Sequence, residues 1–533
     1  MSARKIASLG LIDRRQFMQL SAGSLALAAA ACRRGGDPAY RRGSTVIMAV
    51  SSVNDIKPDE SDLDFLVFSP LTELDEHGAL RPRLAQSWEL SPDRLEWTYH
   101  LRRDVRWHDG VPVTAHDVKF TLDLVSHPDV DQYSFGAVTV VDDYTVTVRV
   151  HRFQDDWGDN INADIVFYPK HLLEGLDPKK FMDWEFWTHP VGSGPYRFVR
   201  YVPETMMELE ANPEYFRGKP KIERVVLKFV GAAGVTELLS GQVDIVHHGL
   251  ASQIPRVLAD PRFRVHYDVL FIAWVIFWKH DNPLFRDPRV RRALTLAIDR
   301  TECLRILNLP ADLPGSDGVF MPRVLFGGKL PAPLPYDPAE ANALLDAAGW
   351  HDRDGEGVRQ RNGRAFHFTA TVPSVNDLPD LAVLVQAHLR RVGVQMEIQA
   401  VMDTSGVGVR IRSGRWEAAF GYLRPWRDVQ KTTFGQGNVT GYSNLEAFRL
   451  IDAAGAASDP DELDRVYGEL TEVYRNDLPF THLVTRAEVH FAHRRVNGLR
   501  GWRSRVLSSA RFPRFRARPD RYMEDLWLDN RSD

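Results

Sequence analysis

Cysteine is scarce in this chain, which has only Cys32 and Cys303 among its 533 residues. Cys32 stands directly after an apolar N-terminal segment, so the chain beyond that point holds a single thiol. A disulfide within the mature chain and a paired-cysteine zinc site are therefore both excluded. Cys303 follows a strongly helical stretch, and we expect it to be an inert buried thiol.

The sequence also lacks a strong excess of charge, long apolar runs and common catalytic motifs. A formal net charge of −4 provides no broad basic surface, so nucleic acid is not an expected partner. After residue 31, no apolar run approaches the roughly 20 residues that a membrane-spanning helix needs. The patterns HExxH, GxSxG and complete GxGxxG are absent, and neither a metal nor a cofactor is predicted. An exported enzyme stays open as an alternative, because catalytic triads are recognised in space rather than in sequence order.

The N-terminus has the pattern of an export signal. Basic residues at positions 4, 5, 14 and 15 accompany an apolar, alanine-rich stretch from Phe17 to Ala31. This pattern predicts a signal peptide over residues 1–31, and the sequence DRRQFM at 13–18 resembles a twin-arginine signal. We therefore predict an exported protein with a flexible tether over residues 32–43.

The position of Cys32 predicts a lipid anchor. Lipoprotein precursors carry at this place the cysteine that is lipidated after cleavage, although the third residue before it is Ala29, where leucine is usual. Lipidation would hold the protein on the outer side of the cytoplasmic membrane, whereas simple cleavage would release it into the periplasm. Both outcomes stay open.

Hydrophobic periodicity predicts an α/β protein. From Leu95 to Leu101, apolar and polar residues alternate as in a half-buried strand, and His108-Asp109-Gly110 then supplies a tight turn. A helix with a capping box is expected to begin at Thr114. Further helices are expected after Asp287-Pro288 and Asp337-Pro338, with short strands between them.

The helix that follows Asp287-Pro288 has the clearest amphipathic pattern. Val290, Leu294 and Ile298 lie on one helical face and predict its core stripe. On this pattern the arginines at positions 289, 291 and 292 are all expected to face solvent.

Several segments together resemble one protein family. They are, in chain order, Arg81–Val118, VGSGPY at 191–196, GQVDI at 241–245, Asn282–Arg300 and Tyr336–Gly355. Their order and spacing are similar to those of the extracytoplasmic solute-binding proteins of ABC transporters, in the peptide/nickel-binding family 5. Weaker matches extend the resemblance from about residue 45 to residue 500.

The resemblance implies a periplasmic-binding-protein-like α/β fold of type II, in the large three-lobed form. Hinge strands would join the lobes, and the ligand would lie in the cleft between them. Lobe I would comprise residues 44–61, 192–267 and 484–533, lobe II residues 62–191, and lobe III residues 268–483.

The resemblance also implies a function. The lobes would close around a small organic solute, above all a peptide, and an ABC permease in the cytoplasmic membrane would read the closed form of a monomeric receptor. A receptor for a metal chelate or an oligosaccharide, and a receptor that signals to a sensor partner, are alternatives.

Site residues follow from the same resemblance. Asp428 lies in a segment where many family members carry an acid that pairs with the α-amine of a peptide, and Arg424, Trp426, Tyr422 and Phe434 are candidates for the same wall. A salt bridge between Asp428 and a neighbouring arginine is the alternative for the acid. Core packing is the alternative for the aromatic rings.

His247 and His248 follow the GQVDI segment directly. In the family, residues after this strand approach the cleft, so contact with an organic solute, contact with a metal chelate and a plain loop are all open. Adjacent side chains on an extended segment are expected to point in opposite directions, which makes the pair a poor chelate by itself.

Overall fold

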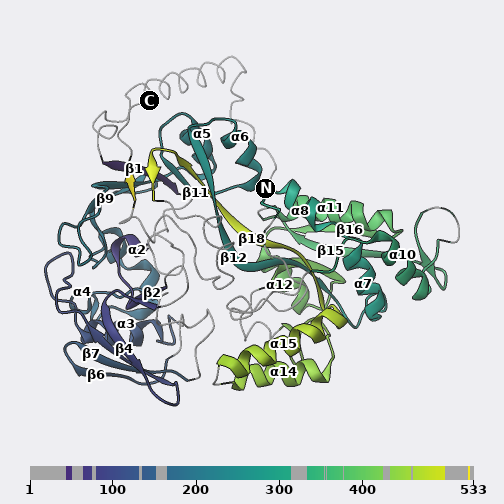
Figure 1. The fold of residues 1–533 in the computed structure, drawn as a ribbon, viewed down its shortest axis with the longest axis horizontal. Coiled ribbons are helices and arrows are strands. Elements are labelled where there is room, and N and C mark those ends of the chain that lie inside the picture. The colour runs from purple at the N-terminus through teal and green to yellow at the C-terminus, as the bar shows by residue number, and fades with distance from the viewer. Residues whose placement is uncertain are drawn as a thin grey trace, which may run out of the picture.

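Two long antiparallel strands, β12 (Phe263–Trp278) and β18 (Phe480–His493), run side by side through the centre of the molecule (Figure 1). They belong to one ten-stranded sheet of order β16-β15-β17-β12-β18-β11-β1-β10-β9-β8. The two strands therefore join two α/β halves of the chain through a continuous hydrogen-bonded sheet.

The computed structural model describes residues 44–50, 64–74, 80–130, 135–151, 165–311, 313, 333–352, 355, 357–375, 377–423, 433–457, 460–498 and 526–528. The predicted signal peptide, the tether with Cys32, and the segment that holds Arg424, Trp426 and Asp428 lie outside these residues. The predicted lobe boundaries remain a prediction, since β12 and β18 continue through two of them.

We call the first half of the large sheet half A. Its strands are β1 (Thr45–Val50), β8 (Tyr196–Val202), β9 (Met206–Ala211), β10 (Arg224–Phe229) and β11 (Ile245–Gly249). β1 pairs in parallel with β10 and β11, and β11 continues antiparallel to β18. The helices α5 (Gly234–Leu239) and α6 (Ile254–Leu258) share a small core with this part of the sheet.

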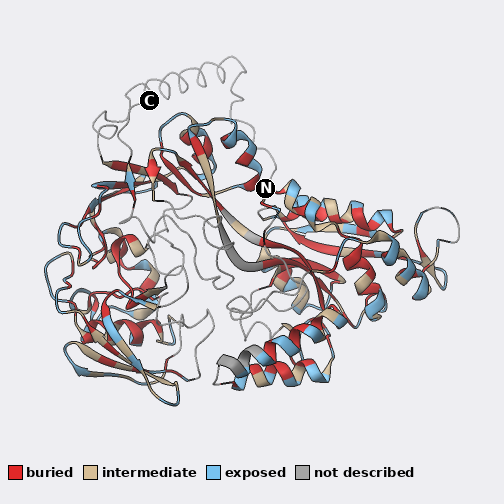
Figure 2. Ribbon diagram, in the orientation of Figure 1, coloured by how far each residue is buried: buried red, intermediate tan, exposed pale blue. Residues whose placement is uncertain are grey.

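We call the second half of the large sheet half B. Its strands are β15 (His367–Pro373), β16 (Gln395–Val401) and β17 (Ala418–Leu423). The helices on its two faces are α7 (Pro288–Leu296), α8 (Arg300–Ile306), α10 (Pro338–Ala347) and α11 (Leu378–Arg391), and α12 (Thr404–Arg412), α14 (Leu445–Ala456) and α15 (Pro460–Asp477). Side chains of β12 alternate between two cores, because Trp274, Ile276 and Trp278 enter one and Val275 and Phe277 the other. Figure 2 shows buried residues on the strands of half B and on the helices around it.

A separate four-stranded sheet has the order β4-β5-β7-β6. Its elements are β4 (Ala85–Leu90), β5 (Glu96–Leu101), β6 (Val138–Asp142), β7 (Thr145–Arg149) and the helix α3 (Ala115–Val125). Its hydrophobic core is continuous with the β1 and β8 side of half A. The four-stranded sheet is therefore packed firmly against half A.

Short elements complete the described chain. They are α2 (Asp64–Val67), β2 (Thr72–Leu74), β3 (Leu80–Pro82), α4 (Lys170–Leu173), η2 (Pro178–Asp183), η3 (Glu185–Thr188), η4 (Gly231–Ala233), η5 (Ala251–Gln253), β13 (Gln360–Arg361), β14 (Arg364–Ala365), β19 (Val496–Asn497) and β20 (Trp527–Leu528). No helix among the described residues is both long and apolar enough to span a membrane.

The predicted strand, turn and helix around residue 108 are confirmed. β5 buries Tyr99 and Leu101, Gly110 adopts φ +92°, and the capping box of Thr114 and Asp117 opens α3. The turn is packed tightly, because His108 contacts the VGSGPY segment. The backbone N–H of Gly192 donates to Nδ1 of His108 at 3.2 Å, and Nε2 of the same ring lies 3.1 Å from the carbonyl oxygen of Gly194.

The glycines of VGSGPY are required by close backbone approach rather than by an unusual φ. A Cβ atom at Gly192 would lie 1.7 Å from the carbonyl oxygen of Val67, and one at Gly194 would lie 2.6 Å from the carbonyl carbon of the same residue. The 191–196 segment therefore contacts two neighbours closely, α2 through Val67 and the 81–118 segment through His108.

The predicted helix after Asp287 is confirmed, but one of its arginines faces inward. The carboxylate of Asp287 accepts a hydrogen bond from the backbone N–H of Arg289, as a capping residue should. The expectation that Arg291 faces solvent is wrong, because its guanidinium is buried and donates to the carbonyl oxygens of Phe285, Asp477 and Leu478. The amphipathic pattern misplaced it because an arginine can be buried where several carbonyl groups converge.

Candidate functional site

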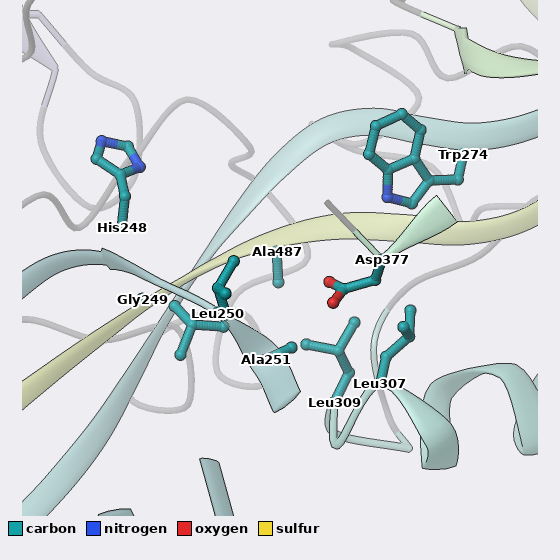
Figure 3. Close-up of a pocket in the computed structure, with 10 residues that line it drawn as sticks. His248, Gly249, Leu250, Ala251, Trp274, Leu307, Leu309, Asp377 and Ala487 are labelled. Carbon is teal, nitrogen blue, oxygen red and sulfur yellow. The ribbon is translucent and has the colours of Figure 1, made fainter. Parts of the chain in front are cut away.

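A pocket of about 80 Å³ lies where β12 and β18 pass from half A to half B (Figure 3). It is lined by His248, Gly249, Leu250, Ala251, Trp274, Leu307, Leu309, Asp377, Ala487 and Val489. These residues come from the end of β11, from β12 and β18, from the segment after α8 and from the start of α11. The pocket is therefore lined from both halves of the sheet.

The strands are irregular at this point. The register between β12 and β18 shifts between Val269 and Ala273 and again between Trp274 and Val275. β11 also shifts its register against β18 between Val246 and Gly249. Such irregularities bend strands and redirect side chains, and here they lie beside the pocket, where Gly249 at the end of β11 pairs with Val489 of β18.

Close packing fixes the end of β11. A Cβ atom at Gly249 would lie 2.2 Å from the ring of Phe491 on β18, so only glycine fits there. His248 adopts a left-handed conformation with φ +57°, which is uncommon for a non-glycine residue. Its backbone N–H donates to Nδ1 of His490 at 3.4 Å. These contacts hold the half-buried His248 side chain beside the pocket.

Four histidines gather at the His248 end of the pocket. The ring centroids of His247 and His248 are 4.0 Å apart, and the ring of His490 lies 4.9 Å from the first and 5.6 Å from the second. His266 stands directly opposite His490 in the β12–β18 ladder. Burial lowers the pKa of His490 well below its ordinary value, and the other three histidines lower it further. Burial, with a contribution from Arg264, lowers the pKa of His266 to about 4.

The histidine cluster is not a metal centre by its geometry. Among the residues that the structure describes, no group of three or more histidine, cysteine, aspartate or glutamate side chains is placed to hold a metal ion. Because the pKa values of His266 and His490 are low, both rings are neutral at neutral pH. His266 and His490 therefore contribute neutral rings to the cluster.

Asp377 supplies the carboxylate of the pocket. It is half-buried at the N-cap position of α11, yet its side chain makes no capping hydrogen bond with that helix. In Figure 3 its carboxylate reaches toward Ala487 and Leu309, on the side of the pocket away from His248. The polar side chains among these lining residues are therefore the Asp377 carboxylate, the Trp274 indole and, at the opposite end, the His248 imidazole.

Only some of the site residues predicted from the sequence lie at this pocket. Of the candidates, His248 lines the pocket and His247 is buried beside it. Tyr422 on β17 stands opposite Trp274, and the two ring centroids are 6.1 Å apart. Phe434 is fully buried among Phe277, Tyr474 and Phe480, so the structure places it in the core of half B. Arg424, Trp426 and Asp428 lie outside the described residues.

The expected opposition of His247 and His248 is wrong. Adjacent side chains point in opposite directions only on an extended segment, whereas the left-handed conformation of His248 and the register shift of β11 bring the two rings together. Sequence reasoning also missed Asp377, Trp274 and His490. Their proximity depends on the long-range pairing of β11, β12 and β18, which no local pattern reveals.

Crossing strands join two α/β halves, and both halves line a pocket at the crossing. This arrangement is that of a periplasmic-binding-protein-like solute receptor. The model of the bacterial extracellular solute-binding proteins, family 5 Middle, matches residues 79–439 of the chain. The protein belongs to this family, whose members are extracytoplasmic solute-binding proteins of transporters rather than enzymes.

Proteins similar to this chain differ in what they bind. The oligopeptide-binding protein AppA of Bacillus subtilis (strain 168) is 25% identical over 499 residues, which cover 88% of this chain and 90% of AppA. The structure of AppA with a nonapeptide has a TM-score of 0.67 at 23% identity, covering 92% of this chain and 99% of AppA. NikZ of Campylobacter jejuni, in complex with Ni(L-His), has the same TM-score and identity, covering 86% of this chain and 96% of NikZ. The shared fold is therefore compatible with chemically different solutes.

Proposed function

We propose that the chain captures a peptide between its lobes outside the cytoplasm and delivers it to an ABC import permease. Membership of family 5 is the observation that carries this proposal. The name of the relative AppA, an oligopeptide-binding protein, supports the peptide as the class of solute. The pocket at the crossing strands supports capture between lobes, because a solute there would touch both halves of the sheet.

In the proposed mechanism, lobe I (44–61, 192–267 and 484–533) and lobe III (268–483) meet at β12 and β18, and lobe II (62–191) is packed on lobe I. The solute favours the closed form only to the extent that it binds this form more tightly than the open one. The register shifts in β12 are suitable positions for hinge bending, because the hydrogen-bonded ladder is already interrupted there.

Thermal unfolding with a panel of solutes tests the proposal. A peptide at 100 times its dissociation constant should stabilise the protein by about 2.7 kcal/mol, since it binds the folded state alone. Matched samples with an oligosaccharide and with nickel–histidine serve as controls. Stabilisation by one of these controls, with no response to any peptide, would contradict the assignment of the solute class.

We further propose that residues 1–31 direct export by the twin-arginine route and that lipid on Cys32 anchors a monomeric receptor. The basic pair Arg14-Arg15 and the position of Cys32 support these proposals. Cys32→Ser should move the protein from the membrane fraction to the soluble periplasmic fraction. A variant that stays with the membrane would show that lipid on Cys32 is not the anchor.

Within the cleft, we propose that Asp428 pairs with a cationic group of the peptide, with Trp426, Tyr422 and Arg424 nearby. The family resemblance supports this role, since charge-assisted hydrogen bonds between ammonium and carboxylate contribute about 1.5–3 kcal/mol each. Asp428→Ala should weaken the binding of an amine-bearing peptide with little change in stability. Unchanged affinity would remove Asp428 from the site.

A further inference from the structure

A second cavity lies between α3 and α4, beside the four-stranded sheet. It has a volume of about 470 Å³, and its lining residues all come from the ranges 116–127 and 170–184. In Figure 1 the two helices lie at the end of the molecule away from β12 and β18. Pockets that hold small molecules have volumes of about 300–1,000 Å³. This cavity therefore has the size of a ligand site and is separate from the pocket at the crossing strands.

The cavity has an apolar wall with two aromatic rings. Its apolar side chains are Phe120, Leu124, Leu173, Leu176, Pro178 and Trp184. Trp184 is held firmly, because its indole N–H donates to the carbonyl oxygen of Asp177 at 3.0 Å and its ring lies edge-on to that of Phe181 at 5.2 Å. Leu176 lines the cavity yet is 42% exposed. An apolar ligand would therefore remove apolar protein surface from water.

Hydrogen bonds hold the two sides of the cavity in place. The buried carboxylate of Asp117 accepts one hydrogen bond from the backbone N–H of Thr114 at 2.8 Å and another from that of Lys170 at 3.0 Å, so it ties the start of α3 to the start of α4. The backbone N–H of Tyr168 also donates to Oγ1 of Thr121 at 2.9 Å. The cavity is therefore formed before a ligand arrives, which reduces the cost of binding.

The ionic side chains that line the cavity already have partners. Lys119 lies 2.9 Å from the carboxylate of Asp123, and Lys170 lies 3.4 Å from that of Glu174, so the formal charges of the four groups cancel. Each of the two lining imidazoles lies 3.5 Å from a carboxylate oxygen, in the pairs His116–Asp143 and His127–Asp129. A charged ligand would have to displace one of these partners, whereas an uncharged ligand leaves them in place.

We infer that this cavity is a second ligand site, which takes an uncharged aromatic molecule. The rings of Phe120 and Trp184 suit an aromatic body, and the volume has room for about 15 water-sized groups at ~30 Å³ each. A protein partner fits less well, because stable protein interfaces engage about 20–30 residues on each side and thirteen residues line this cavity. The inference goes beyond the proposed function and does not depend on it.

The first test uses two dyes that share one ring system. N-phenyl-naphthylamine is uncharged, and anilinonaphthalene sulfonate adds a negative charge to the same rings. In fluorescence titrations of the full chain, the uncharged dye should bind at least 10-fold more tightly. Leu176→Glu should weaken its binding by at least 10-fold, because it adds a charge to the apolar wall. Leu172→Glu is the matched control, since that leucine of α4 is also 42% exposed but does not line the cavity.

The second test concerns the paired charges. Asp123→Asn removes the partner of Lys119, so the affinity for the sulfonate should rise by about 2- to 5-fold while that for the uncharged dye stays the same. Glu469→Gln makes the corresponding change to the pair with Arg465 on α15 and should alter neither affinity. Thermal unfolding of each variant checks that its fold is intact.

The possible failures are distinguishable. Tighter binding of the sulfonate than of the uncharged dye by the wild type, or equal losses in Leu176→Glu and Leu172→Glu, overturns the inference even if peptides bind well. Displacement of the uncharged dye by a peptide that stabilises the protein would place the dye in the solute cleft and also overturn it. Dye binding that depends on Leu176, with no stabilisation by any peptide, supports the second site and contradicts the peptide as solute.

Discussion

The turn around His108 and the pocket around His248 are both built on histidines, yet they differ in how the sequence encodes them. His108 lies in a stretch whose strand, turn and helix follow one another along the chain, and the ring is hydrogen-bonded through both nitrogens to the segment at 192–194. His248 acquires its neighbours from β12, β18 and α11, far away in the sequence. The first region carries part of the family resemblance, and the second forms only when elements far apart in the sequence come together.

Substitution of Gly192 by alanine should produce the largest effect on the scaffold. The added Cβ would lie 1.7 Å from the carbonyl oxygen of Val67, so the backbone must move. We expect a loss of at least 4 kcal/mol in unfolding free energy or failure to fold, at the upper end of the costs of overpacking. Chemical denaturation measures this loss.

Gly455→Ala is the matched control for Gly192→Ala. Gly455 lies in α14 with no atom within 4 Å of an added Cβ, so alanine should stabilise the protein by about 0.5–1 kcal/mol. Similar effects of the two substitutions would refute the assignment of Gly192 to a close backbone contact.

Acid should destabilise both regions through neutral buried histidines. Burial lowers the pKa of His108 and of His266 from 6.5 to about 4. Below pH 6.5 the unfolded chain binds protons that the native rings do not, so stability falls until the pH reaches about 4. At pH 5 each histidine should account for a loss of about 2 kcal/mol, at 1.36 kcal/mol per pH unit.

The substitutions His108→Gln and His266→Gln test the acid sensitivity of each region separately. Each variant should reduce the loss of stability between pH 7 and pH 5, as measured by urea unfolding at both pH values. His108→Gln should in addition be less stable at pH 7, because it removes both hydrogen bonds to the 192–194 segment. Nε2 of His266 is buried without a hydrogen-bond partner among the described residues, so its replacement should cost less at pH 7. An unchanged pH dependence in both variants would contradict the neutral state of the rings.

The sequence was most informative where structure is local. The capping box at Thr114, the turn at Gly110 and the N-caps at Asp287 and Asp337 depend on neighbours within a few residues, and all were predicted correctly. The inward position of Arg291 and the grouping of the histidines depend on elements nearly 200 residues away or more. Such contacts appear only when strand register is known, which is why the predicted site overlapped the pocket so little.

Substitution of Phe434 in half B distinguishes a role in core packing from a role in solute contact. The ring is fully buried among aromatic side chains of one core, whereas the sequence made it a candidate for the solute wall. Phe434→Leu should lower the unfolding free energy by about 1 kcal/mol and leave peptide affinity unchanged, because it removes core volume only. Denaturation and calorimetry on the same preparation measure both quantities. A clear loss of affinity in a stable variant would return Phe434 to the site.

Leu250→Ala should have the opposite effects to Phe434→Leu, namely weaker solute binding with the smallest change in unfolding free energy. This leucine lines the pocket but is 49% exposed, so Leu250→Ala should change the unfolding free energy by no more than about 0.5 kcal/mol. Leu258→Ala is a matched control, because that side chain is 56% exposed on the nearby α6 and does not line the pocket. If the pocket is a solute contact, Leu250→Ala alone weakens binding, whereas equal affinities of the two variants would place the specificity of the receptor elsewhere in the cleft.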